Sequence, residues 1–297
     1  MIAIVGPAKA RLKHPRVQDC LSEGSHRGRV DTDRVGHAPY FPQMVQPVTR
    51  PKPVPEVPPG WVVAPPDFVG VGAGRCGTSW WWRLLSQHPA VARPNRYKEV
   101  HFFDHYLDVT EVEPQSYHRY FPRPPGMLAG EWTPLYMYDF WTPPMLRMVA
   151  PDARLLVMLR DPVERYLSGL AFIRARGFPV NQAMLHYQYE RSLYGQQFAT
   201  LLAHFPREQV LVLQYERCAA EPLRELRRTC EFIGADATGW RPAQSPAELV
   251  NQSAAEKPQL PAATQAALGA ALRADAAVLG RLLPELDLSL WRTLAAA

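Results

Sequence analysis

Residues 69–82, VGVGAGRCGTSWWW, form a glycine-rich stretch typical of a loop that binds phosphate. Gly72, Gly74 and Gly77 fit the dinucleotide pattern G-x-G-x-x-G, and with the following Thr-Ser they nearly fit the P-loop pattern G-x-x-x-x-G-K-[ST]. The P-loop lysine is missing, and Arg75 lies inside the loop instead. Such loops point backbone N–H groups and a helix N-terminus at an anion. The stretch therefore predicts an anion site and leaves the anion open.

A second segment, LLVMLRDPVERYLSG, has the signals of a strand (155–159) that leads into a helix. Asp161 can cap this helix, and Pro162 suits its first position. Glu164 lies where the partner of a capping box belongs. The sequence thus predicts that the helix begins immediately after the strand.

Arg160 and Ser168 are candidate phosphate ligands in this second segment. Arg160 ends the strand, and open α/β sheets bind ligands at the carboxyl ends of their strands. Ser168 lies about two helical turns after the cap, on roughly the same helix face. An arginine fork with a hydroxyl suits a phosphate dianion. The alternative is that Arg160 pairs with a neighbouring carboxylate and Ser168 lies on the surface.

The segment KEVHFFD, residues 98–104, carries groups suited to proton transfer. In an extended chain, Glu99 and His101 point to one face, so a carboxylate and an imidazole could share a site. The alternative is that His101 and Asp104 only hold the loop together. The region 97–141 is also rich in aromatic residues, which suit the walls of a sugar or phenol site unless most of them are core.

These elements predict an α/β fold, namely a P-loop-like three-layer domain with a central, mostly parallel sheet flanked by helices. A strand is expected at 67–72 and a helix from Ser79 that is closed by Pro89. Residues 1–60 are basic and proline-rich, and predict a poorly ordered tail or linker, or alternatively an extended arm, before a domain at 61–297. The alanine-rich C-terminal part predicts a packing helix that ends before Pro284.

Composition limits the classes of partner. The chain of 297 residues has 33 Lys and Arg against 28 Asp and Glu, and residues 1–60 hold nine and five of them. The rest is nearly neutral, which argues against nucleic acid as a partner. Cys20, Cys76, Cys218 and Cys230 lack metal or redox spacing, so we expect a reduced, cytoplasmic protein. We find no apolar run near the ~20 residues of a membrane helix and no signal peptide.

Five motifs together resemble the sulfotransferase family, whose members use 3′-phosphoadenosine 5′-phosphosulfate (PAPS). GRCGTSW…LLSQHP and LLVMLRDPVERYLSG are similar to its two phosphosulfate-binding segments. KEVHFFD closely resembles the acceptor-side motif of the heparan sulfate sulfotransferases, and GEWTPLYMYD (130–139) resembles their following strand and loop. Residues 205–234 resemble the strand and helix that close the nucleotide site. The resemblance covers about residues 66 to 235.

The resemblance implies that the loop binds the 5′-phosphosulfate and that Arg160 and Ser168 bind the 3′-phosphate. Arg75 stands where most sulfotransferases have lysine and where the tyrosylprotein branch has arginine. Trp80 and Tyr215 correspond to aromatic residues near the adenine, although Tyr215 also fits an ordinary strand end. The implied contacts to PAPS, or to its product PAP, come from Arg75, Cys76, Gly77, Thr78, Ser79, Trp80, Arg160, Ser168 and Tyr215.

The resemblance also implies in-line sulfuryl transfer, without a metal, to a hydroxyl of a carbohydrate, glycolipid or other small molecule. Arg75 would stabilise the leaving phosphate by its charge, because arginine does not readily give up a proton. Glu99 is favoured as the general base, assisted by His101 and Asp104. His101 is the second candidate for the base, since cytosolic relatives use a histidine.

Two departures from the family pattern stand out. Trp132 occupies a place where heparan-type enzymes usually carry lysine, and 251–261 lacks the usual basic glycine loop, with Lys257 as a candidate substitute. Three alternatives remain: a P-loop nucleotide kinase, a dinucleotide-dependent oxidoreductase, and a binder of adenosine nucleotides without activity. A kinase needs the missing lysine and a metal-binding aspartate. An oxidoreductase needs an acidic residue about 20 residues on, where only Glu99 is available.

Overall fold

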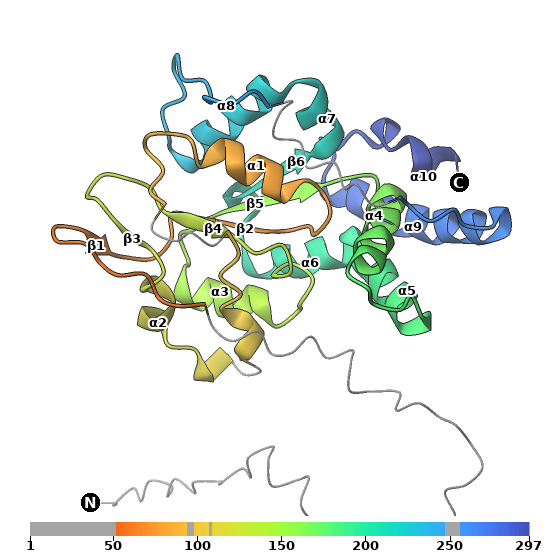
Figure 1. Cartoon of the computed structure of the whole chain (residues 1–297), viewed down its shortest axis with the longest axis horizontal. Coiled ribbons are helices and arrows are strands. Elements are labelled where there is room, and N and C mark those ends of the chain that lie inside the picture. Colours follow the sequence, from red (N-terminus) through yellow and green to blue (C-terminus); the bar gives the residue numbers. More distant parts are fainter. Residues whose placement is uncertain (1–51, 94–97, 107–108, 247–255, 297) are drawn as a thin grey trace, which may run out of the picture. The chain divides into compact units, whose positions relative to one another are not determined.

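Four parallel strands form the central sheet, in the order β4-β2-β5-β6 (Figure 1). The structure is a computed structural model that describes residues 52–93, 98–106, 109–246 and 256–296. The strands are β2 (Phe68–Gly72), β4 (Gly130–Trp132), β5 (Arg154–Leu159) and β6 (Val210–Gln214). Every residue of β2, β4 and β6 is buried, as expected of parallel strands that helices cover on both faces.

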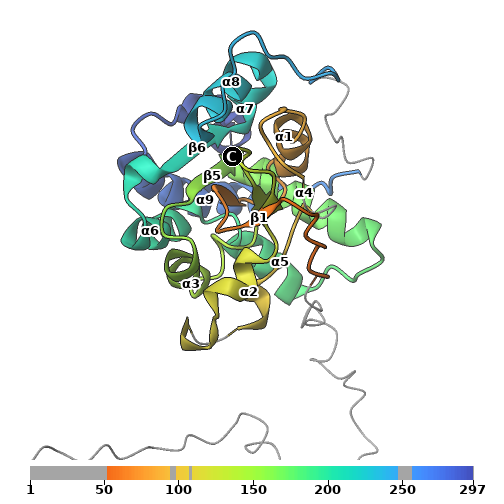
Figure 2. The same ribbon diagram turned by 90° about the vertical axis from the view of Figure 1, so that its left-hand side faces the viewer.

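Helices cover the two faces of this sheet. In Figures 1 and 2, α1 and α8 lie on one face, and α3 and α6 lie on the other. A short antiparallel pair, β1 (Val62–Val63) with β3 (Pro122–Arg123), lies outside the sheet. The helices are α1 (Thr78–Leu85), α2 (Pro114–His118), α3 (Thr142–Val149), α4 (Pro162–Ala175), α5 (Gln182–Glu190), α6 (Tyr194–His204), α7 (Tyr215–Ala220), α8 (Pro222–Ile233), α9 (Ala262–Leu282) and α10 (Arg292–Ala296). The predicted three-layer α/β fold is confirmed.

The strand order creates a crevice at the centre of the sheet. The chain leaves β2 for β4 on one side and then crosses to β5 on the other side, so β2 and β5 flank a topological switch point. The glycine-rich loop follows β2, and the N–H of Ala73 donates to the carbonyl of Met158 in β5 at 2.9 Å. Because α4 starts directly after β5, the two predicted phosphate-binding segments begin at the same point of the fold.

Helix α1 begins where the sequence predicts but ends early. Its last residue is Leu85, whereas the prediction continued to Pro89. The N–H groups of Gln87 and His88 donate to the carbonyls of Leu84 and Leu85 at 3.1 and 3.0 Å. These i→i+3 bonds tighten the chain into turns before the proline is reached.

Helix α4 has the predicted cap but not the predicted capping box. The Asp161 carboxylate accepts from the N–H groups of Val163 and Glu164, at 3.0 and 3.3 Å, and Pro162 is the first helical residue. In a capping box, Glu164 would accept from the N–H of Asp161. That N–H donates instead to Glu216, at 2.9 Å, because the start of α7 lies beside it. The carboxylate of Glu164 is thereby free to bind cations.

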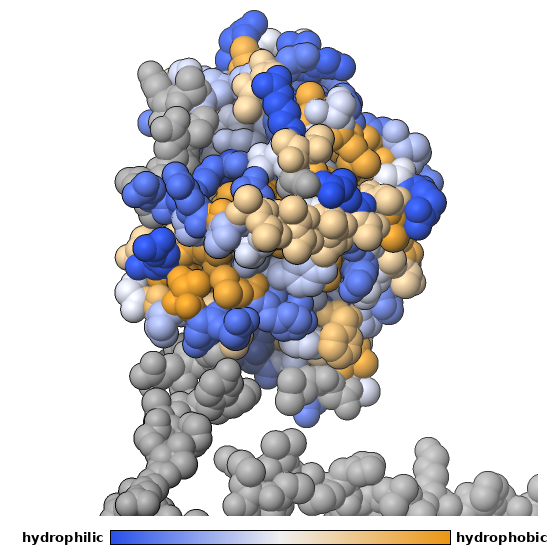
Figure 3. Space-filling view, turned by 90° about the vertical axis from the view of Figure 1, so that its right-hand side faces the viewer, coloured by the Kyte–Doolittle hydropathy of each residue, from blue (hydrophilic) through white to orange (hydrophobic). Residues whose placement is uncertain are grey.

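The ends of the chain bear on two further predictions. Helix α9 ends at Leu282, which confirms a packing helix before Pro284. The face that carries α4, α5, α9 and α10 mixes hydrophilic residues with weakly and strongly hydrophobic ones (Figure 3). Within the described ranges, no helix is long and apolar enough to cross a membrane.

At the N-terminal end, most of the predicted tail (1–51) lies outside the described residues. The Tyr120 hydroxyl donates to the Lys52 carbonyl at 2.7 Å, a contact that the extended-arm alternative expects.

Candidate active site

The glycine-rich loop presents a helix N-terminus that no side chain caps. Gly77, the N-cap of α1, has a φ of 93°, in the left-handed region that favours glycine, and as a glycine it has no side chain that could cap the first N–H groups. A Cβ at Gly77 would also lie 2.7 Å from the ring of Tyr215. The N–H groups at the start of α1 are therefore available to an anion, as the loop pattern predicts.

Arg75 and Ser168 meet beside this loop. The Nε and Nη2 atoms of Arg75 lie 3.4 and 3.3 Å from Oγ of Ser168, which is only 6% exposed. The guanidinium also lies 4.5 Å from the ring centre of Phe172. Burial lowers the pKa of Arg75, and the nearby positive charge of Arg191 lowers it further. Such mutual repulsion among cations is relieved when an anion binds between them.

Arg160 lies at the end of β5 with a carboxylate partner. Its Nη2 is 2.9 Å from Glu164 Oε2, and its guanidinium lies 4.9 Å from the ring centre of Tyr215. Lys257 binds the same oxygen of Glu164. The ion pair matches the alternative for Arg160, whereas Ser168 is buried and not on the surface. Arg160, Glu164 and Lys257 thus form one charged group near the start of α4.

The remaining residues of the glycine-rich loop and of the first turn of α1 are buried or half-buried. Cys76 is buried, with its Sγ 3.3 Å from the Tyr194 hydroxyl, and burial raises the pKa of its thiol. Trp80 is 2% exposed and donates its indole N–H to the carbonyl of Pro246 at 2.9 Å. Its ring meets that of Tyr215 edge-on at 5.9 Å, so the two residues predicted to lie near adenine are neighbours. Ser79 is half-buried on the first turn of α1.

A cluster of proton-accepting groups lies on the segment 98–104. His101 Nε2 is 3.0 Å from Glu99 Oε2, and its Nδ1 is 2.8 Å from Asp104 Oδ2. The predicted proximity of Glu99 and His101 is therefore confirmed. The predicted extended conformation is wrong: His101 has a φ of 56°, and residues 103–105 form a 3₁₀ turn that brings Asp104 back to the ring.

Contacts within this cluster shift the pKa values of Glu99 and His101. Burial by itself would raise the pKa of Glu99, but the hydrogen bond from His101 and the nearby Lys98 outweigh burial and lower it to about 2. Burial would lower the pKa of His101, but Asp104 and Glu99 outweigh it and raise this pKa to about 9. At neutral pH, Glu99 is thus an ionised acceptor and His101 is a cation without a lone pair for a proton.

Lys98 joins the two halves of the site, and sequence reasoning missed it. Its ammonium donates to Thr78 Oγ1, in the first turn of α1, at 3.2 Å and to Glu99 Oε1 at 2.8 Å. Burial lowers the pKa of Lys98, while Glu99 acts against this shift. Strict alternation places residues 98 and 99 on opposite faces, so only the irregular backbone of 98–104 allows their side chains to meet.

A buried carboxylate holds this irregular segment in place. Glu131, on β4, accepts from the N–H of Val100 at 2.9 Å and from the hydroxyls of Thr133, Tyr117 and Tyr136 at 2.5, 2.8 and 3.0 Å. Thr133 and Tyr136 in turn accept from the N–H groups of His101 and Phe102, at 3.3 and 2.9 Å. Backbone donors that a strand ladder would satisfy are thus satisfied by side chains.

The aromatic residues of 97–141 are mostly core. Phe102, Phe103, Tyr117, Tyr120, Phe121 and Tyr136 are at most 5% exposed and pack edge-to-face or tilted against one another. The alternative that most of these aromatic residues are core is therefore confirmed for these six. Trp132 is fully buried, and its indole N–H donates to the carbonyl of Gly72 at 3.1 Å. A Cβ at Gly70 would overlap its ring, so the tryptophan is wedged beneath the loop.

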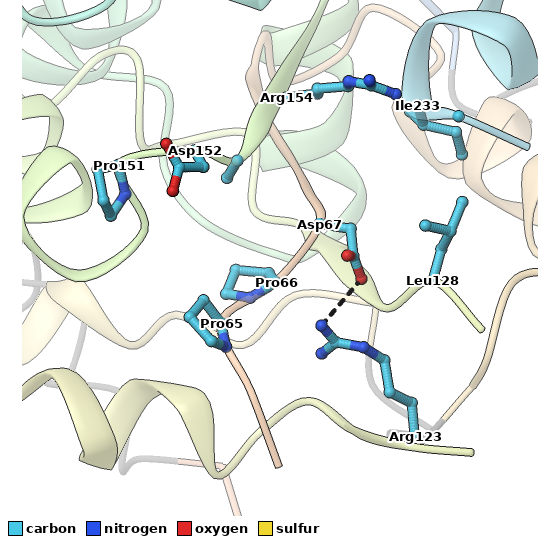
Figure 4. Close-up of a pocket in the computed structure, with 11 residues that line it drawn as sticks. Pro65, Pro66, Asp67, Arg123, Leu128, Pro151, Asp152, Arg154 and Ile233 are labelled. Atoms are coloured by element: carbon cyan, nitrogen blue, oxygen red, sulfur yellow. Dashed lines mark ion pairs between the residues drawn. The ribbon is translucent and has the colours of Figure 1, made fainter. Parts of the chain in front are cut away.

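A separate cavity lies at the opposite, amino-terminal ends of the strands. It has a volume of about 540 Å³ and is lined by residues that include Pro65, Pro66, Asp67 and Arg154 (Figure 4). Asp67 pairs with Arg123 at 3.2 Å across it. No residue predicted to bind or catalyse lines this cavity, so the candidate site is the one at the carboxyl ends.

The fold and the site together define a class of protein. An α/β sheet with a glycine-rich anion loop at its switch point, beside an ionised carboxylate, is typical of group-transfer enzymes with a P-loop-like fold. The sulfotransferase domain family matches residues 65–265, and the chain belongs to this family. The predicted resemblance to the sulfotransferases is thereby confirmed at the level of the family.

Similar proteins come from distant organisms. Heparan sulfate glucosamine 3-O-sulfotransferase 6 of Mus musculus is 30% identical over 185 residues, which are 57% of this chain and 52% of that protein. Membrane-associated sulfotransferase kil1 of Dictyostelium discoideum is 32% identical over 114 residues, 38% of this chain and 24% of that protein. The chain thus matches about half or less of these relatives. The crystal structure of a sulfotransferase from Alicyclobacillus acidocaldarius has a TM-score of 0.64 at 28% identity, covering 77% of this chain and all of that one.

Proposed function

We propose that the protein transfers a sulfuryl group from PAPS to a hydroxyl of a carbohydrate, glycolipid or other small-molecule acceptor. One observation carries this proposal: the Lys98 ammonium bridges Thr78, in the anion-binding turn, and Glu99, the ionised carboxylate. Thr78, in the turn that can bind the donor, and Glu99, which can accept a proton, thus share the Lys98 ammonium as a hydrogen-bond donor. This is the spacing that direct transfer between two bound substrates needs.

The residues of the loop fit a donor with two anionic ends. The uncapped start of α1 and the guanidinium of Arg75 suit the 5′-phosphosulfate, which supplies the activated sulfuryl group. Ser168 and Arg160 suit a 3′-phosphate. For Arg160, binding the phosphate would compete with its bond to Glu164, and Lys257 can then keep that carboxylate paired.

Glu99 is the proposed general base. The acceptor hydroxyl becomes strongly acidic only as its oxygen bonds to sulfur, so a weak base that is ionised at every physiological pH is sufficient. Its side chain is 37% exposed, which leaves room for an acceptor. His101, held as a cation by Asp104 and Glu99, orients the carboxylate and offers no lone pair. Arg75 stabilises the charge that develops on the leaving phosphate.

The relatives favour a sugar as the acceptor. Several are named heparan sulfate glucosamine 3-O-sulfotransferases, and KEVHFFD (98–104) resembles the acceptor-side motif of that branch. The nearly neutral charge of residues 61–297 favours a short or lightly charged glycan over a long polyanion. We also propose, as the sequence predicts, that residues 1–60 form a tail outside the catalytic domain, and that the protein acts in the cytoplasm without a metal.

Thermal unfolding with nucleotides tests the donor. A ligand that binds only the folded state adds about 2.7 kcal/mol of stability at a hundredfold excess over its Kd. We expect PAP to raise the melting temperature more than AMP, NAD or ATP with Mg²⁺. Sulfate transfer from PAPS to a panel of glycosides, oligosaccharides and phenols then identifies the acceptor class. A shift with NAD or Mg-ATP alone would overturn the proposal in favour of an oxidoreductase or a kinase.

A further inference from the structure

Arg191 lies directly against the glycine-rich loop. This residue follows α5, and a Cβ added at Gly74 would overlap its Nη2 atom. Gly74 itself does not lie in the left-handed region, and among the described residues such a Cβ would meet only the side chain of Arg191 within 4 Å. A side chain at the middle glycine of the G-x-G-x-x-G pattern would therefore displace the end of Arg191 from its present position.

Arg165 joins the glycine-rich loop to the end of α5, next to Arg191. Fully buried Arg165, on α4, donates from Nε to the carbonyl of Gly74 at 3.1 Å. The same guanidinium donates to the carbonyl of Gln188, on α5, at 2.5 Å and to Ser192 at 3.2 Å. Arg165 thus fixes both the loop and the end of α5, so the approach of Arg191 to Gly74 is built into the fold.

Arg191 is half-buried, and its guanidinium lies against Gly74 of the loop. In the ranges that the structure describes, it has an aromatic contact to Tyr187, at 5.2 Å, but neither a hydrogen-bond acceptor nor an ion pair. Its charge lowers the pKa of Arg75 on the donor side. Burial and Asp104 raise the pKa of Asp139 to about 7, and both Arg191 and His101 act against this rise. Arg191 therefore lies within electrostatic range of the loop and of the acceptor-side cluster.

We propose, on the basis of the function proposed above, that Arg191 binds the sulfuryl group itself, as a second cation beside Arg75. In the transfer, the bond from sulfur to the phosphate oxygen breaks and its electron pair leaves on PAP. The new bond forms to the acceptor oxygen, whose proton goes to Glu99. Arg191 donates two hydrogen bonds to sulfuryl oxygens and keeps its protons. Since Trp132 fills the place where the family pattern has lysine, that lysine is not available to these oxygens, and Arg191 would add its charge to those of Arg75 and Lys98.

Comparing PAPS with PAP isolates this contact, because only PAPS carries the sulfuryl group. For Arg191→Gln, we expect PAPS to bind about 10- to 100-fold more weakly, as for the loss of a charged hydrogen bond, while PAP affinity changes less than about twofold. We expect kcat/KM to fall by roughly 100-fold. Arg147→Gln is the matched control, since Arg147, on α3, also lies over an aromatic ring, 5.7 Å from the ring centre of Phe205, and is exposed.

Gly74→Ala tests the same idea without removing the arginine. The new Cβ must displace the guanidinium, so this variant should lose PAPS affinity and turnover as Arg191→Gln does. In the double variant, the second change should cost almost nothing more. Equal losses of PAP and PAPS in Arg191→Gln, no loss of either, or additive losses in the double variant would overturn the assignment. Failure of the wild-type protein to bind PAP would instead overturn the proposed function.

Discussion

The donor side and the acceptor side of the site are built in different ways. The donor side uses the ends of regular elements: the loop after β2, the first turn of α1 and the first turns of α4. The acceptor side is the irregular segment 98–104, which is itself neither strand nor α-helix and is held at β4 by the Glu131 carboxylate and the Trp132 N–H. The packing of the whole sheet fixes where the regular elements end. A few side-chain hydrogen bonds fix the irregular segment.

This difference assigns separate tasks to the two regions. The donor side offers backbone N–H groups and arginines, which bind charge at any pH. The acceptor side holds titratable groups, Glu99, His101 and Asp104, whose charges depend on one another. Changes on the donor side should therefore alter nucleotide affinity, and changes on the acceptor side should alter turnover or its dependence on pH.

Glu99→Gln should separate the two regions most clearly. The amide cannot accept the proton of the acceptor hydroxyl, so we expect kcat to fall by about 10²- to 10⁴-fold. Binding of PAP should be unchanged, because Glu99 belongs to the acceptor side. Sulfate transfer and calorimetric titration with PAP measure the two quantities, and Glu113→Gln, at an exposed carboxylate, is the control. Full activity in Glu99→Gln together with its loss in His101→Ala would make His101 the base.

Arg160→Ala should have the opposite signature. Loss of a charged hydrogen bond to the 3′-phosphate should weaken PAP by about 10- to 100-fold. Binding of AMP, which lacks that phosphate, should change little. The turnover of enzyme saturated with PAPS should remain close to that of the wild type. Equal weakening of PAP and AMP would show that Arg160 acts only through its pair with Glu164.

The sequence predicts the donor side better because its signals are local. The apolar strands, the Asp161 cap and the loop glycines each act within a few residues, and the ends of parallel strands then bring Arg75 to Ser168. On the acceptor side, the motif indicates which residues matter but not their conformation. Val100 is held by Glu131, 31 residues away. Neither propensity nor periodicity reports a contact between a side chain and such a distant backbone group.

Arg165 and Arg191 escaped prediction for the same reason. Arg165 is separated by 91 residues from Gly74, whose carbonyl it binds. A signal was nevertheless present, since Gly74 has no role in the P-loop pattern and its small size required an explanation. Lys98 could have been found from its place beside Glu99, had the segment not been interpreted as a strand.

Glu131→Gln tests whether the buried carboxylate supports the acceptor side alone. The glutamine side chain has an NH₂ group where the glutamate has an acceptor oxygen, so some of the buried hydroxyl and N–H donors lose their acceptor. We expect these unsatisfied groups to lower the free energy of unfolding by about 1–3 kcal/mol. Turnover should fall because Val100 and its neighbours lose their anchor, while PAP affinity is kept. Urea denaturation measures the stability. A variant that loses PAP binding in proportion to turnover would mean that the two regions fold as one unit.

The dependence of stability on pH gives the smallest but most specific signal from the acceptor side. The pKa of His101 is raised from 6.5 to about 9, so its stabilising contribution is complete below about pH 6.5 and is lost as the pH rises through about 9. The pKa of Glu99 is lowered from 4.5 to about 2, so its contribution is present above about pH 4.5 and is lost as the pH falls through about 2. Between pH 6 and 9.5, Glu99 stays ionised, whereas His101 titrates together with Asp139, whose pKa is raised to about 7.

His101→Gln should remove this part of the pH dependence. Relative to the variant, the wild-type melting temperature should fall by an additional 2–4 °C or so between pH 6 and 9.5, the shift that about 1 kcal/mol causes in a domain of this size. His204→Gln, on α6, is the control for loss of a histidine. Parallel curves for the wild type and His101→Gln would mean that the imidazolium is not held by Glu99 and Asp104. His101 would then be neutral near pH 7 and would again be a candidate for the general base.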